Sequence, residues 1–179
     1  KISNIKSNFS IGNKKLYFKS IDFKEGKNLI SVKDLVINKK NEIEKISYVN
    51  LLTFDNNIEN NNFKISIGKK ISIFGTRYDS TFLLKLLSSN NKLKIFKNFN
   101  NNLEVKLKNI RTKSGTTLKN FNLIGTIKKG TFHKISAKSE FSKDEFLDIN
   151  LRKDPNGKKI IEVYSDLPQA LLADSKFFD

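Results

Sequence analysis

Cysteine and methionine are missing from this sequence of 179 residues. The absence of cysteine excludes disulfides, thiolate metal ligands and cysteine nucleophiles. The absence of methionine, even at the first position, predicts that the chain is a piece of a longer or processed polypeptide. No run of about 18 apolar residues occurs, and no basic stretch followed by an apolar one opens the chain. Any membrane anchor or export signal is therefore expected outside this fragment.

Histidine is almost absent, and no catalytic constellation is apparent. The single histidine, His133, has no cysteine and no second histidine with which to complete a zinc site, so we interpret it as part of a strand face. Asp144 and Glu145 are adjacent, and adjacent side chains of an extended backbone point to opposite faces, which makes them a poor carboxylate pair. No phosphate-binding loop, G-x-S-x-G or Walker-type motif occurs. The sequence predicts no enzyme, no metal site and no cofactor.

Arginine is scarce although the chain is strongly basic. The net charge is +16 and the pI is near 9.9, but only Arg77, Arg111 and Arg152 among the 34 basic residues are arginine. Nucleic-acid recognition favours the arginine fork. The lysines alternate with apolar residues along the chain, as in "LEVKLKNI", which is typical of solvated strand faces. A nucleic-acid patch and attraction to an anionic membrane surface stay open as alternatives.

Alternating apolar and polar residues predict β-strands along nearly the whole chain. The alternation is clearest at Leu103, Val105 and Leu107 and less regular over residues 16–23, 29–37 and 43–54. It recurs at Ile65 and Ile67, Ile71 and Ile73, Phe121, Leu123 and Ile127, Leu147, Ile149 and Leu151, and Ile161 and Val163. Turn-forming stretches such as "KEGKN", "SGTT", "KKGT" and "DPNGKK" separate the runs. We predict an all-β antiparallel meander of about ten or more strands.

Two short leucine-rich segments are predicted to be capping helices. Polar residues at 79–80 can cap a first helix over residues 82–87, and those at 165–166 can cap a second that begins near Pro168. Each helix follows a strand and a longer meander. We therefore predict a structural repeat, with one β-meander and its helix in residues 1–88 and a second in residues 89–179.

Three segments carry a resemblance to a known family: "GTRYDSTFLLKLLS", "NNLEVKLKNIRTKSGTTLKNFNLIGTIKKGTFHKISAKSEF" and "LDINLRKDPNGKKIIEVYSDLPQALLADSKFF". Together they resemble the C-terminal repeat region of AsmA-like proteins, the envelope family of the TamB and YhdP type, in its α-proteobacterial form. The resemblance covers residues 71–179, and residues 1–70 share only the general pattern. The chain departs from the family at Leu167 and Pro168, where relatives carry Asp-Ala or Asp-Pro and a glycine, and in its high lysine content.

The resemblance implies a bridge-like lipid carrier. Members of this family look like long, curved β-sheets that form an open trough with an apolar interior, along which phospholipid tails move through the periplasm between the inner and outer membranes. For this chain the resemblance implies a periplasmic location, an inner-membrane anchor outside the fragment, neighbouring repeats in a longer chain, and phospholipid acyl chains as the ligand. It implies no active-site residue.

The residues themselves support an apolar ligand for a separate reason. A sheet with one apolar face and few helices must close on itself, pack on another sheet or bind something apolar. The predicted lining of a lipid groove consists of Leu103, Val105, Leu107, Phe121, Leu123, Ile127, Leu147, Ile149, Leu151, Ile161 and Val163. One alternative is a structural or assembly module of the envelope in which these residues form an ordinary sandwich core. The other is a basic nucleic-acid-binding β domain.

Overall fold

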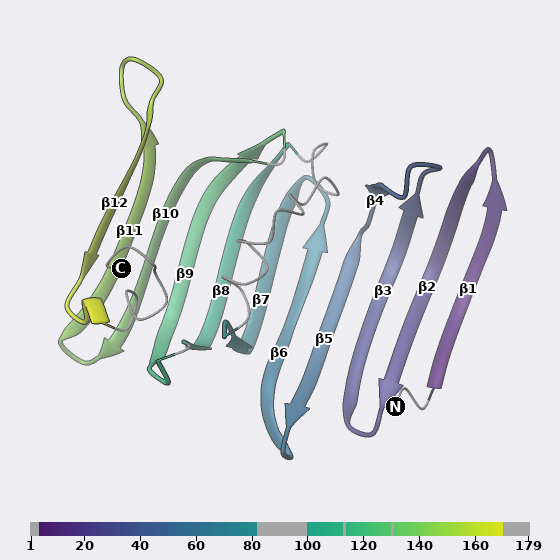
Figure 1. Cartoon of the computed structure of the whole chain (residues 1–179), viewed down its shortest axis with the longest axis horizontal. Helices are drawn as coiled ribbons and strands as arrows, with labels where there is room; N and C mark the ends of the chain where they lie inside the picture. The colour runs from purple at the N-terminus through teal and green to yellow at the C-terminus, as the bar shows by residue number, and fades with distance from the viewer. Residues whose placement is uncertain (1–3, 82–99, 113, 130, 170–179) are drawn as a thin grey trace, which may run out of the picture.

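One open sheet accounts for the fold of the chain (Figure 1). The structure is a computed structural model that describes residues 4–81, 100–112, 114–129 and 131–169. The strands are β1 (Asn4–Gly12), β2 (Lys15–Glu25), β3 (Asn28–Ile37), β4 (Ile43–Lys45), β5 (Tyr48–Asp55), β6 (Ile58–Ile67), β7 (Lys70–Asp79), β8 (Asn101–Arg111), β9 (Thr117–Lys128), β10 (Thr131–Ser142), β11 (Glu145–Lys153) and β12 (Lys159–Ser165). They lie side by side in sequence order, except that the short strand β4 pairs with β3 beside this path. The all-β prediction is confirmed.

Tight turns join most neighbouring strands. Asn13 and Lys14 connect β1 to β2 with φ of 50° and 57°, and such paired positive φ values match the twist of a two-residue hairpin. Gly26 and Gly115 have φ of 55° and 84° in turns that the sequence predicted. In "KKGT" the central Gly130 lies outside the described residues. Short turns of this kind make antiparallel pairing the rule in this sheet.

The pairing of β7 with β8 is the exception, because these two strands are parallel. The sequence-based prediction of a wholly antiparallel meander is therefore wrong at this point. Parallel neighbours need a long connection, and residues 80–100 separate the two strands. The predicted boundary between residues 88 and 89 falls within this connection, outside the described residues, so the division into two repeats stays a prediction. The sheet itself continues from β7 to β8 without a break.

The two predicted capping helices are not borne out. The first, over residues 82–87, lies outside the described residues. Of the second, Pro168 and Gln169 lie in a helical turn and the remainder is again outside them. Strands are the only regular elements of the described ranges, and within those ranges no helix is long and apolar enough to cross a membrane.

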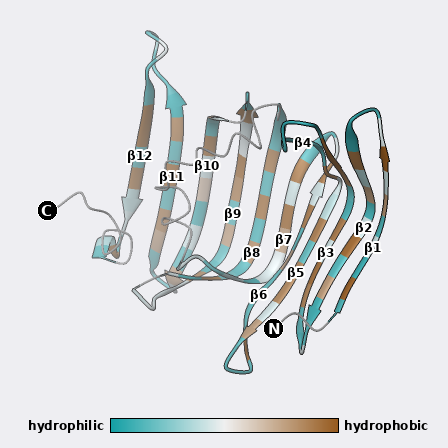
Figure 2. Cartoon of the chain, turned by 45° about the vertical axis from the view of Figure 1, so that its right-hand side comes forward, coloured by the Kyte–Doolittle hydropathy of each residue, from teal (hydrophilic) through white to brown (hydrophobic). Residues whose placement is uncertain are grey.

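The cross-strand register sorts the side chains onto two faces. Residues directly opposite each other on neighbouring strands point to the same side of a sheet. Val105 lies opposite Ile73 and Leu123, Leu123 lies opposite Ala137, and Ala137 lies opposite Ile149. We call this side the apolar face and the other the polar face. Figure 2 shows the alternation of hydrophobic and hydrophilic residues along the curved strands.

Strands β6 and β7 approach each other closely on the apolar face, beside an irregularity of their register at Asn62 and Phe63. A Cβ atom added at Gly75 would lie 2.4 Å from the Cβ of Phe63 and 2.4 Å from the backbone oxygen of Asn62. In an ordinary antiparallel pair, opposed Cβ atoms are about 4.5–5.5 Å apart. The two strands therefore converge on this face, and only glycine fits at position 75.

Candidate functional site

The predicted groove residues share one face of the sheet. Val105 lies opposite Leu123, Leu107 opposite Phe121, and the β11 residues Ile149 and Leu151 lie opposite Val163 and Ile161 of β12. Leu103 and Leu147 belong to the same face because they alternate with the polar residues of their strands, and Leu147 lies opposite Ser139. Ile127 lies on the apolar face opposite Asn101, at the start of β8. The structure thus brings the eleven residues to one side, and their binding role stays a proposal.

These residues differ widely in exposure. The buried ones, at 2% to 8% exposure, are Leu103, Val105, Leu107, Leu147 and Leu151. The half-buried ones are Phe121, Leu123, Ile127 and Ile149. Only Ile161 and Val163, at 64% and 54%, are exposed. The part of the apolar face over β8–β11 is thus already covered by the chain itself, and β12 is the predicted segment that presents open apolar surface.

A hydrophobic cluster fills the apolar face over β7–β11. Its buried members are Ile71, Leu103, Val105, Leu107, Ile110, Leu118, Phe141 and Leu147. Two residues from outside the main strands, Ile46 before β5 and Leu167 after β12, pack against this cluster. Leu167 is one of the positions at which the chain departs from the family pattern. In the structure its side chain is packed against the cluster.

The opposite end of the same face carries an open apolar surface. In β1 the side chains of Ile5, Phe9 and Ile11 are 58%, 55% and 73% exposed. The register places them opposite Phe23, Phe18 and Leu16 of β2, which are half-buried. We call Ile5, Phe9, Ile11, Leu16, Phe18, Phe23 and Ile30 the N-terminal apolar surface. Sequence reasoning did not select any of them as groove residues.

Two hollows adjoin this surface. One, of about 340 Å³, includes Phe9, Phe18 and Leu35, but most of its lining comes from the polar face, with Ser10, Tyr17 and Lys45 among it. The other, of about 320 Å³, is lined by Phe23, Lys24, Glu25, Asn28 and Ile30. Phe9 and Phe18 pack at a centroid distance of 5.7 Å in a tilted arrangement, which keeps the two rings together on the apolar side. The described fold is therefore hollowed at its N-terminal strands, where large apolar side chains face outward.

An irregularity of the strands explains why sequence reasoning missed this surface. In β2 the apolar face is formed by Leu16 and Phe18, and then by Ile21 and Phe23, so the parity changes near Lys19. In β3 the same change occurs at Asp34, whose φ is 50°. A bulge of this kind inserts one residue and reverses the alternation beyond it. The strict period of two that marks β8 is therefore interrupted in both strands.

The polar face is held together by charged and cation–π contacts. Glu104 forms ion pairs with Lys70 and with Lys106, the latter at 2.8 Å. The hydrogen bonds from these two lysines lower the pKa of Glu104 to about 2. The ammonium groups of Lys33 and Lys106 lie 5.5 and 5.9 Å from the ring centroids of Tyr48 and Phe74. Two lysines therefore lie over two aromatic rings of this face, those of Tyr48 and Phe74.

A polar pocket of about 370 Å³ lies at the opposite end of the strands from the β1–β2 turn. It includes Arg77 and Arg111, and the carboxylates of Asp55, Glu59 and Asp79 are also in its lining. The Arg77 guanidinium donates to the backbone oxygen of Glu59 at 2.9 Å. The mixture of charges fits neither a simple anion site nor an apolar tail, so this pocket is not part of the lipid hypothesis.

The residues that were considered for catalysis do not come together. His133 lies in β10, and Asp144 lies in the turn before Glu145, the first residue of β11. Burial lowers the pKa of His133, and the positive charges of Lys128, Lys153 and Lys159 lower it further. Within the described ranges no group of three or more histidine, cysteine or acidic side chains could hold a metal ion.

Comparison with protein-family models, curated proteins and solved structures returns no match to this chain.

Proposed function

We propose that this chain is a segment of an AsmA-like, bridge-type protein that carries phospholipid through the periplasm along an apolar β-groove. The observation that carries the proposal is an open sheet with one apolar face, on which large residues such as Phe9, Ile11 and Ile161 are exposed. Apolar side chains left exposed together on one face of a folded protein support a binding site for an apolar ligand. The proposal includes an inner-membrane anchor and further repeats in the parent chain.

The dimensions of the sheet suit a track better than a closed pocket. Neighbouring strands lie about 4.8 Å apart, so the eleven strands of the main path span roughly 48 Å. This exceeds the hydrocarbon thickness of a bilayer, which is about 30 Å. An acyl chain of about 16 carbons gains on the order of 12 kcal/mol from burial before ordering costs, without any directional contact. Tails can therefore bind without a fixed position on the uncovered parts of this face, over β1–β3 and β12.

A second function is favoured by one observation, the packed cluster over β7–β11. Because Leu147 and Val105 are already buried, this part of the face behaves as an ordinary core. A structural or assembly module of the envelope that binds protein partners would need such a core and would not need bound lipid. The two functions differ in what the exposed apolar residues contact.

Retention of phospholipid tests the proposal. The protein is mixed with phospholipid vesicles and separated from them by gel filtration, and the lipid that remains with the protein is extracted and quantified by mass spectrometry. We expect retained phospholipid, and we expect less of it for Ile11→Asp and Ile161→Asp, whose side chains lie on the apolar face.

Ile124→Asp is the matched control. Ile124 is 61% exposed, nearly the same as Ile161 at 64%, but it lies opposite Glu104 on the polar face. Its substitution is expected to leave lipid retention unchanged, and circular dichroism checks that all variants keep their strands. A native protein without bound lipid, or an equal loss in the Ile124 variant, would favour the structural module.

A further inference from the structure

Every Lys-Lys dipeptide of the sequence lies at the same end of the strands. Strand directions alternate along the sheet apart from the parallel pair β7 and β8, so the connections after β1, β3, β6, β9 and β11 fall at one end, the upper end in Figure 1. The dipeptides at or beside these connections are Lys14-Lys15, Lys39-Lys40, Lys69-Lys70, Lys128-Lys129 and Lys158-Lys159. We call these ten residues the lysine edge.

The other end of the strands has a different character. Acidic residues lie at or next to the ends of the strands there, namely Glu25, Asp55, Asp79, Asp144, Glu145 and Asp166. Basic residues such as Lys27 and Lys143 occur singly among them. Within the described ranges, consecutive lysines do not occur at this end. The lysines that looked evenly scattered in the sequence are therefore sorted by the alternation of strand direction, and the sheet has one strongly positive edge.

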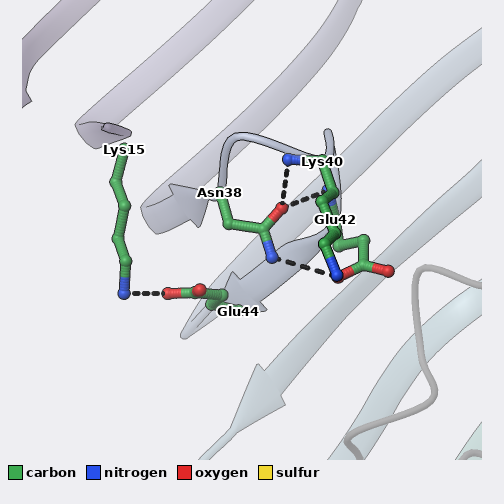
Figure 3. Close-up of polar contacts among 5 residues, drawn as sticks. All are labelled: Lys15, Asn38, Lys40, Glu42 and Glu44. Atoms are coloured by element: carbon green, nitrogen blue, oxygen red, sulfur yellow. Dashed lines mark hydrogen bonds and ion pairs between the residues drawn. The ribbon is translucent and has the colours of Figure 1, made fainter. Parts of the chain in front are cut away.

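The carboxylates near the lysine edge either shape its turns (Figure 3) or pair with Lys15 and Lys70. Glu42 accepts a hydrogen bond from the Asn38 side chain at 3.0 Å, and Asn38 in turn accepts from the backbone N–H of Lys40 and of Glu42. Glu44 pairs with Lys15 at 2.6 Å, which raises the pKa of Lys15. Acidic side chains thus shape the β3–β5 connection. Among the described contacts, Lys39 and Lys40 form no ion pair with a carboxylate.

Like charges are brought together at the β11–β12 end of the edge. Lys153 and Lys159 are directly opposite each other in the register, an arrangement that destabilises a sheet. Asp154 lies between them in the turn, and its side chain accepts a hydrogen bond from the backbone N–H of Lys158 at 2.8 Å. The lowered pKa of the nearby His133 has the same positive charges among its causes. An arrangement that costs stability in the isolated protein is suited to an anionic partner.

Exposed apolar residues lie next to the lysines. Ile11 precedes the β1–β2 turn and is 73% exposed, Phe132 follows Lys128-Lys129 and is 46% exposed, and Ile161 follows Lys158-Lys159 and is 64% exposed. Lysines beside apolar side chains are typical of surfaces that bind at the interface of an anionic bilayer. Positive charge alone could also attract nucleic acid, but nucleic-acid recognition favours arginine, and Arg152 in β11 is the one described arginine near this edge.

We propose that the lysine edge docks onto the anionic headgroups of a phospholipid membrane, with the strands standing on the bilayer surface at their upper ends. Each lysine near an anionic surface strengthens binding by about fivefold at moderate ionic strength. Several lysines along one edge act together, and the attraction weakens as salt is added. This docking does not depend on the apolar face binding lipid tails, so the two proposals can fail separately.

Vesicle sedimentation tests the docking. The native chain is centrifuged with vesicles of phosphatidylcholine alone and with vesicles that contain one third phosphatidylglycerol, at ~50 and ~200 mM salt. We expect binding only to the anionic vesicles and a marked loss at the higher salt. A quadruple variant of the edge, with Lys128, Lys129, Lys158 and Lys159 each changed to Gln, should bind roughly 600-fold more weakly, at about fivefold for each lysine.

The control removes the same charge elsewhere. Lys19, Lys27, Lys64 and Lys143 are exposed and lie outside the lysine edge, and their change to Gln should leave vesicle binding within about threefold of native. An equal loss in this control would show that net charge, not the edge, drives binding and would overturn the proposal. Absence of vesicle binding by the native chain, or edge-dependent binding of duplex DNA without vesicle binding, would overturn it as well.

Discussion

The apolar face runs through two regions of one sheet, but it is open at β1–β3 and buried at β7–β11. Ile5 and Ile11 of β1 are 58% and 73% exposed, whereas Leu103 and Leu147 of the later strands are 7% and 2% exposed. All four residues point to the same side by register. The period of a strand therefore determines the face of a side chain, and the neighbours that pack over it determine its exposure.

This difference separates stability from binding. The cluster over β7–β11 supplies most of the buried apolar contacts of the described residues and therefore most of the stability we expect from them. The N-terminal apolar surface contributes less because water still reaches it. It is the part of the face that is available to a ligand, together with β12.

The largest expected effect comes from truncation in the buried region. Leu147→Ala removes a side chain that is 2% exposed and should lower the free energy of unfolding by about 2–5 kcal/mol. Ile11→Ala removes a side chain of similar size at 73% exposure and should change it by less than about 0.5 kcal/mol. Urea unfolding followed by circular dichroism measures both. A similar loss of unfolding free energy in the two variants would contradict the distinction between the buried and the open region.

The next largest loss of stability is expected at Gly75, where β7 meets β6. Gly75→Ala places a Cβ atom 2.4 Å from Phe63 and from the backbone of Asn62, and the relief of this clash should cost about 1–3 kcal/mol. Gly68→Ala is the matched control because a Cβ atom there meets nothing within 4 Å. Urea unfolding of both variants tests this close approach. A Gly75 variant as stable as the Gly68 variant would contradict the close approach of β6 and β7.

Acid should lower the stability of the fold through protonation of Glu104, which lies on the polar face. Its pKa is lowered from 4.5 to about 2 in the folded protein, so the folded state binds fewer protons than the unfolded chain between these values. Stability from this group is complete above pH 4.5 and is lost as the pH falls toward about 2. Glu104→Gln should make the unfolding midpoint less sensitive to pH in that window. An unchanged pH dependence in this variant would show that the lysine pairs contribute nothing.

The smallest effect is expected at the exposed β12 edge. Arg152 contacts Glu162 at 2.6 Å across β11 and β12, but the two side chains are 54% and 51% exposed. Solvent screens such a pair, so a double-mutant cycle with Arg152→Gln and Glu162→Gln should give a coupling close to zero. A coupling well above the experimental error would mean that solvent does not screen the pair at this edge.

Sequence reasoning found the parts of the fold that follow from a regular period. Leu103, Val105 and Leu107 alternate strictly, and their strand and common face were predictable from that pattern. The face of Phe18 and Phe23 was not predictable because the parity of β2 changes near Lys19, and a bulge leaves no simple mark in the sequence. The parallel pairing of β7 and β8 depends on a long connection, which sequence reasoning assigned to a helix. The exposure of the apolar side chains was also not predictable, because Ile46 and Leu167 pack against the cluster only in the folded tertiary structure.

Contact between acyl chains and the apolar face is the central claim, and site-specific quenching tests it most directly. The chain has no cysteine, so Ile11→Cys, Ile161→Cys and Ile124→Cys each give a single labelling site for an environment-sensitive fluorophore. Phospholipid with a nitroxide on its acyl chain is then added. Quenching of the labels at positions 11 and 161, with the label at position 124 on the polar face unaffected, is the predicted result. Equal quenching at all three positions, or none at any, would contradict the proposal that this face carries lipid.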